Sequence, residues 1–80
     1  MGLGPCKVRV WFWDGVFGVR VGCWLDAEDG GWPVLHHSRR RQDVQPFENR
    51  AAAMKAVDTV LGVDREFGSW DVNRIEIVAF

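Results

Sequence analysis

The sequence predicts an α+β protein, a two-layer sandwich in the order β-β-β-α-β with a mainly antiparallel sheet and one amphipathic helix on one face. Two observations carry this prediction. Two alternating apolar segments are joined by Asp14-Gly15, and a later Ala-rich segment, 47–62, has apolar residues at helical spacing. Eighty residues make a single domain, 1–80. One helix covers only one face of a sheet, so the opposite face is expected to be a contact surface.

The first two strands are predicted to form a tight hairpin. Asp-Gly between alternating apolar runs favours a two-residue type I′ turn, because both central residues of that turn need positive φ. Such a turn fixes the register of the two strands. It pairs Trp13 with Val16, Phe12 with Phe17, Trp11 with Gly18, Val10 with Val19, Arg9 with Arg20, Val8 with Val21 and Cys6 with Cys23.

Side chains alternate along a strand, so this register sorts the hairpin into two faces. One face is uniformly apolar and is the predicted core: Cys6, Val8, Val10, Phe12, Phe17, Val19, Val21, Cys23 and Leu25. The other, which we call the Trp/Arg face, holds Lys7, Arg9, Trp11, Trp13, Val16, Gly18, Arg20, Gly22 and Trp24.

The rest of the chain supplies the third strand, the helix and the last strand. A strand is expected over 32–38, with proline at its start, and another over 74–80. Asn49 is the expected N-cap of the helix and Gly62 its C-terminal stop. Residues 63–73 are expected to be irregular. The apolar stripe of the helix is Ala53, Ala56, Val57, Val60 and Leu61.

The Trp/Arg face is the candidate partner-binding site. Arg9 and Arg20 oppose each other in the expected register, which is unfavourable unless tryptophan rings or an anionic partner compensate. Trp and Arg also dominate the energetics of protein interfaces. The alternative is that Trp11 only covers the backbone of a strand glycine, Gly18. The candidate contact residues are Arg9, Trp11, Trp13, Arg20 and Trp24.

Direct nucleic-acid binding is the second possibility. Aromatic residues on an open sheet face are typical of base-stacking platforms. The run Arg39, Arg40 and Arg41 could contact phosphates. The net charge of −1, however, gives no overall basic field to attract a polyanion.

Catalysis and metal binding are not expected. The chain offers no convincing nucleophile with a base and an orienting group, and no glycine-rich phosphate loop. His36 and His37 are adjacent and would point to opposite faces of a strand, so they cannot share a metal ion. We therefore expect no enzyme activity, no cofactor and no metal. Cys6 and Cys23 are expected to be buried and reduced, with a disulfide between them as the alternative.

The chain is expected to be cytoplasmic and not to associate with a membrane. The start, MGLGPCK, has neither the basic region nor the apolar region of a signal peptide. Arg9, Asp14 and Arg20 interrupt the longest apolar stretch, so it is too short to span a bilayer.

In layout, the chain resembles the small anti-CRISPR proteins of phages and mobile elements. The shared features are the length, the hairpin-rich α+β domain, the Ala-rich helix NRAAAMKAVDTVLG, the absence of catalytic motifs and an exposed interaction face. The resemblance implies a monomer or homodimer in a bacterial host cell that docks on protein subunits of a CRISPR surveillance complex. Docking would sterically block the binding of target nucleic acid. The segment QPFENRAAAMKAVDTVLG also resembles small plasmid partition-accessory proteins, so the alternative is a plasmid or phage accessory protein that binds DNA or RNA directly.

Overall fold

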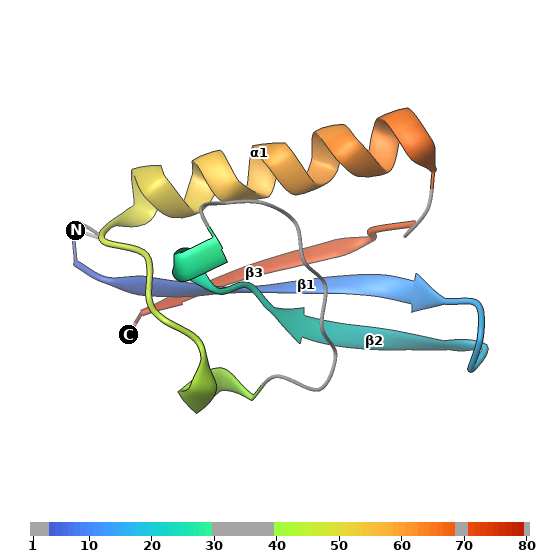
Figure 1. Cartoon of the computed structure of the whole chain (residues 1–80), viewed down its shortest axis with the longest axis horizontal. Helices are drawn as coiled ribbons and strands as arrows, with labels where there is room; N and C mark the ends of the chain where they lie inside the picture. The colour runs from blue at the N-terminus through green and yellow to red at the C-terminus, as the bar shows by residue number, and fades with distance from the viewer. Residues whose placement is uncertain (1–3, 30–39, 69–70, 80) are drawn as a thin grey trace.

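The computed structural model describes residues 4–29, 40–68 and 71–79 and confirms the α+β fold (Figure 1). The strand expected over 32–38 lies outside the described residues. The elements follow the order β1 (Cys6–Asp14), β2 (Val19–Trp24), the 3-10 turns η1 (Ala27–Asp29) and η2 (Arg41–Asp43), α1 (Arg50–Phe67) and β3 (Arg74–Ala79).

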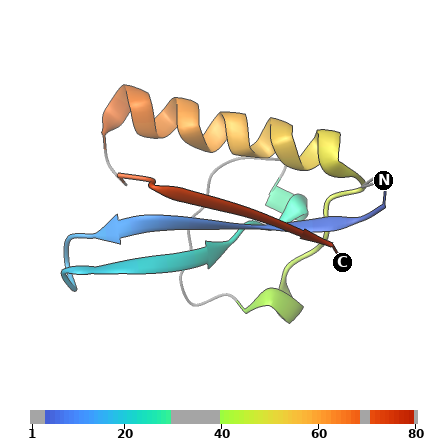
Figure 2. The same cartoon turned by 180° about the vertical axis from the view of Figure 1, so that it is seen from behind.

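The described strands form an antiparallel sheet in the order β2-β1-β3, with β1 in the centre. Helix α1 lies along one side of this sheet and packs on β1 and β3 (Figures 1 and 2). The core fills the space between them. Its largest fully buried side chains are Val8 and Val10 from β1, Cys23 from β2 and Val60 from α1.

The hairpin turn differs from the expected two-residue turn. It spans Gly15 to Gly18, and Asp14 pairs with Val19. The Asp14 carboxylate accepts hydrogen bonds from the backbone N–H groups of Val16 (2.9 Å) and Phe17 (3.2 Å). Gly18, at φ 67°, closes the turn in the left-handed region. The Asp14 side chain thus organises a longer turn, and Gly18 rather than Gly15 supplies the positive φ.

The longer turn moves every cross-strand pair by four residues. Val10 lies opposite Cys23 instead of Val19, and Arg9 lies opposite Trp24 instead of Arg20. Four is an even number, so the shift leaves each strand residue on the face that alternation assigned to it. The expected core face is confirmed at Cys6, Val8, Val10, Phe12, Cys23 and Leu25. Val21 is half-buried, and Phe17 and Val19 are 69% and 48% exposed and do not belong to the core.

The same shift rules out the Cys6–Cys23 pairing. Cys23 lies opposite Val10, four residues further along β1 than Cys6, which is about 13 Å at the rise of a strand. A disulfide needs Cα atoms within about 7 Å. Both cysteines are free and buried, as expected, and the alternative of a disulfide between them is wrong.

Helix α1 begins as expected and ends six residues later than expected, at Phe67 rather than before Gly62. The Asn49 side chain accepts a hydrogen bond from the Ala52 N–H (2.8 Å), which confirms it as the N-cap. The helix continues through Gly62, and Gly68 is the C-cap at φ 62°. Gly62 costs about 1 kcal/mol inside a helix, which packing of the apolar stripe offsets. Residues 63–67 are therefore helical, not irregular.

The segment between η2 and α1 adds core residues that the sequence reading missed. Val44 and Phe47 are 2% and 6% exposed. Phe47 and Cys6 exchange two backbone hydrogen bonds, of 2.8 and 3.0 Å, which tie this segment to the start of β1. The chain here passes from η2 around the end of the sheet to α1 (Figure 1).

Candidate docking surface

Exposure on the Trp/Arg face rises along β1. At one end Lys7 is 5% exposed, and its Nζ donates to the Arg41 carbonyl oxygen (2.5 Å). At the other end Trp13 is 44% exposed. Among the described residues, turn η2 contacts the first end of this face, so the expected contact surface can include only its second end.

The middle of the face is a stack of arginines and tryptophans. The Arg9 guanidinium carbon lies 5.1 Å from the Trp11 ring centroid and 4.8 Å from that of Trp24. Arg41 lies 5.6 Å from the Trp24 centroid and donates to the Ala79 carbonyl oxygen (3.0 Å). These distances are within cation–π range, so part of the apolar surface of both tryptophans is already used inside the molecule.

Gly22 makes room for this stack. A Cβ atom at Gly22 would lie 3.0 Å from both the Arg9 Cδ and the Trp11 ring. Trp11 lies opposite Gly22 in the observed register. Trp11 therefore covers a strand glycine, as the alternative expected, but the glycine is Gly22 rather than Gly18.

Glu76 on β3 is the counter-ion of the stack. One oxygen of its carboxylate accepts a hydrogen bond from the Trp11 indole N–H and lies 3.3 Å from Arg9 Nε, and the other lies 3.9 Å from an Arg74 nitrogen. The Trp11 hydrogen bond lowers the pKa of Glu76, Arg9 and Arg74 lower it further, and desolvation opposes them. The sequence analysis does not include Glu76 among the site residues. The alternation of side chains along a strand could have identified it, because Glu76 lies between Ile75 and Ile77 and must face away from the core.

Removing this charge should change how stability depends on pH. Because the folded protein holds the pKa of Glu76 below its unfolded value, the ionised form adds stability above the unfolded pKa, near 4.5, and this is lost as the pH falls through the folded pKa. Glu76→Gln keeps the acceptor for Trp11 but loses the charge. We expect it to melt below the parent at pH 7, with the gap narrowing below pH 4. A gap that stays constant over this range in thermal melts would contradict the assignment.

At the open end, Arg20 is held from outside the hairpin. Its guanidinium carbon lies 5.7 Å from the Trp13 centroid, and it donates to the carbonyl (2.5 Å) and the carboxylate (2.9 Å) of Asp71. The Asp64 carboxylate accepts from the backbone N–H groups of Asp71 and Val72 and so anchors this segment to α1. The segment after α1 therefore reaches the edge of the Trp/Arg face through Asp71.

The apolar side chains exposed on the hairpin gather at its free end, which projects beyond the last turn of α1 (Figures 1 and 2). We call this group the hairpin tip. It consists of Trp13, Val16, Phe17 and Val19, which are 44, 88, 69 and 48% exposed.

The arginine run does not form a basic patch in the described part of the chain. Arg39 lies outside it, Arg40 is exposed, and Arg41 is held by Ala79 and Trp24.

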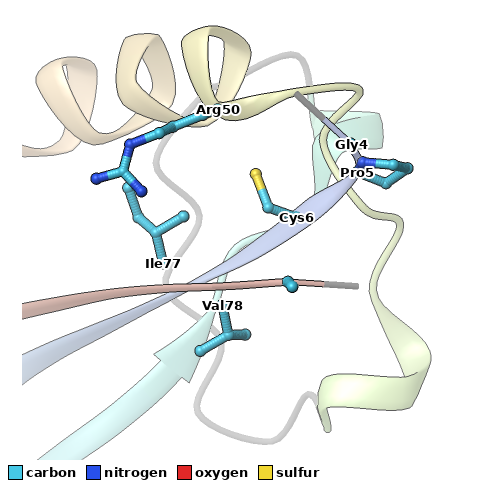
Figure 3. Close-up of a pocket in the computed structure, with 7 residues that line it drawn as sticks. Gly4, Pro5, Cys6, Arg50, Ile77 and Val78 are labelled. Atoms are coloured by element: carbon cyan, nitrogen blue, oxygen red, sulfur yellow. The ribbon is translucent and has the colours of Figure 1, made fainter. Parts of the chain in front are cut away.

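Two further features bear on chemistry. A hollow of about 300 Å³ lies where β1, β3 and the start of α1 meet, with the Cys6 thiol inside and Arg50 at its side (Figure 3). Its described lining holds no carboxylate or imidazole that could act as a base for the thiol. Among the described residues, no three His, Cys, Asp or Glu side chains are grouped to hold a metal ion.

No protein-family model, curated protein or solved structure matches this chain. Within 4–29, 40–68 and 71–79, no helix is both long and apolar enough to cross a membrane.

Proposed function

We propose that this chain is a non-enzymatic inhibitor that docks on a protein subunit of a CRISPR surveillance complex and sterically blocks its target nucleic acid. The observation that supports docking is the hairpin tip. Four apolar side chains are exposed at one end of the molecule, with Trp13 and Val19 on opposite faces of the hairpin, and exposed apolar side chains gathered at one place mark interaction sites in soluble proteins.

The tip is pre-organised for binding. The Asp14 carboxylate holds the turn, and Arg20 holds the Trp13 ring. A loop that is already ordered loses less entropy when it binds, so more of the contact energy contributes to affinity. Trp13 beside Arg20 is also the pair of residue types that most often anchors an interface.

The five candidate contact residues take two roles in this proposal. Trp13 and Arg20 contact the partner directly. Arg9, Trp11 and Trp24 support the strand that presents them, because their side chains stack on one another. Substitutions in the second group are therefore expected to act on binding mainly through the fold.

The proposal is tested by expressing the chain in bacteria that carry one defined CRISPR-Cas type each and plating a phage that the system targets. We expect the parent chain to restore plaque formation in at least one type. Trp13→Ala and Val16→Asp should each weaken binding to the purified complex about tenfold or more. Met54→Asp changes a side chain 40% exposed on α1 and serves as the matched control. Circular dichroism confirms that each variant is folded.

Failure to restore plaques in every CRISPR-Cas type would overturn the inhibitor proposal. A folded Val16→Asp variant that binds as tightly as the parent would remove the tip from it. If the chain instead binds duplex DNA with an affinity that falls steeply with salt, and Arg40→Glu abolishes that binding, the accessory-protein alternative replaces it.

A further inference from the structure

A small hollow lies beside the hairpin tip on the Trp/Arg face. It has a volume of about 180 Å³ and is lined by Trp11, Arg20, Asn73 and Arg74. Two of these side chains are guanidinium cations, and Asn73 carries a side-chain amide that can donate. Hydrogen-bond donors therefore surround an opening with an aromatic side chain in its wall, which is the environment of a bound anion.

The two arginines differ in how many of their hydrogen-bond donors already have an acceptor. Arg20 donates to both the carbonyl and the carboxylate of Asp71. The Arg74 side chain is 67% exposed, and its contact with Glu76, at 3.9 Å, is longer than a hydrogen bond. Glu76 itself is turned to Trp11 and Arg9. Among the described residues, Arg74 thus keeps its donors available for an incoming group.

We propose that the hollow binds a carboxylate side chain of the partner, an Asp or Glu within an apolar segment whose neighbouring side chains cover the hairpin tip. This rests on the proposed function, since it takes the partner to be a protein. A planar carboxylate matches the fork of donors on Arg74 and is attracted by Arg20. The hollow adjoins Trp13 through Arg20, so one short segment reaches both places.

The surrounding charges favour a single carboxylate over the phosphates of a nucleic acid. The carboxylates of Asp71 and Glu76 stand directly beside Arg20 and Arg74. A polyanion gains affinity from successive phosphate contacts, and these two carboxylates would repel the phosphates on either side. An isolated acidic side chain meets this repulsion only once, inside the hollow, where the exposed Arg74 guanidinium offsets it.

The test uses a displayed library of random 12-residue peptides, selected in parallel on the parent chain, on Arg74→Glu and on Arg65→Glu. Arg65→Glu makes the same charge change at an exposed position in the last turn of α1. We expect the parent and control pools to be enriched in Asp or Glu next to apolar residues, and the Arg74→Glu pool in Lys or Arg. A synthetic peptide from the parent pool should bind Arg74→Glu about tenfold more weakly, and replacing its acidic residue by Lys should restore binding to that variant. Arg74→Gln, which adds no repulsion against Glu76, should show the same loss of acidic preference if Arg74→Glu does not fold.

Parent and Arg74-variant pools with the same acidic content would overturn the proposal. So would a twelve-residue oligothymidylate that binds the parent and not Arg74→Glu, because the hollow would then be a phosphate site.

Two other outcomes distinguish failure of this proposal from failure of the proposed function. Selected peptides that lack acidic residues but do not bind Val16→Asp would contradict the carboxylate site in the hollow and support the hairpin tip as the docking site. Acid-dependent peptides that bind Val16→Asp as tightly as the parent support the hollow and contradict the tip.

Discussion

Val10→Asp is expected to leave the domain unfolded at 25 °C. Val10 is 0% exposed in the middle of β1, between its β2 partner Cys23 and its β3 partner Ile75. A carboxylate there would lack a counter-ion, and an uncompensated buried charge costs several kcal/mol. A domain of 80 residues has roughly 5–10 kcal/mol of stability in total. Circular dichroism should show the loss of cooperative thermal unfolding.

Val19→Asp makes the same chemical change on the same face and provides the control. Val19 is 48% exposed at the start of β2, where the carboxylate remains in water. We expect its melting temperature to stay within about 5 °C of the parent's, the effect of roughly 1 kcal/mol in a domain of this size. Alternation in the hairpin does not distinguish the two positions. If both variants unfold, the core extends to the start of β2, and the exposure of Val19 is misassigned.

This contrast shows what the hairpin sequence could and could not predict. The two faces follow from alternation alone, and any register shift by an even number of residues preserves them. The register depends on turn length, and Asp14-Gly15 fits two turns. In the observed one, the Asp14 carboxylate binds two backbone N–H groups and Gly18 takes positive φ. Because the choice lies between two locally acceptable structures, the pattern could not decide it.

The candidate surface was predictable in composition but not in its contacts. Alternation placed the tryptophans and arginines together. Which of them remain available depends on Arg41, Asp71 and Glu76, which lie far from the hairpin in sequence. Long-range contacts of this kind leave no periodic signal in one sequence, except that Glu76 interrupts an apolar strand at alternate spacing.

Local signals at the helix were reliable where the side chain itself makes the contact. Asn49 is an N-cap because its own oxygen accepts the backbone N–H of Ala52. Gly62 and Gly68 are both possible C-terminal stops in the sequence, and the helix continues to Gly68, whose backbone N–H donates to the Asp64 carbonyl oxygen. Phe47 precedes the N-cap by two residues, so helical spacing assigns it to the helix, although it belongs to the core.

Phe47→Ala is therefore expected to destabilise the domain by about 3–5 kcal/mol, the usual cost of removing a buried phenylalanine. Phe47 is 6% exposed in a cluster with Cys6, Leu25 and Ala53. Its backbone pairs with Cys6, so the cavity would open where the segment from η2 joins β1. In a domain this small the loss is a large share of the total stability. Denaturant titration followed by circular dichroism should show a midpoint moved far toward zero.

Phe17→Ala is the matched control, because the same side chain is 69% exposed in the hairpin turn. Its unfolding free energy should change by at most about 1 kcal/mol, as for other surface substitutions. The two variants remove the same atoms, so their difference measures burial rather than residue type. Equal losses at the two positions would mean that the hairpin tip packs against the rest of the chain and is not a free docking surface. A large loss of unfolding free energy for Phe47→Ala alone would show that Phe47 stabilises the fold, whereas Phe17 remains available to contact the partner.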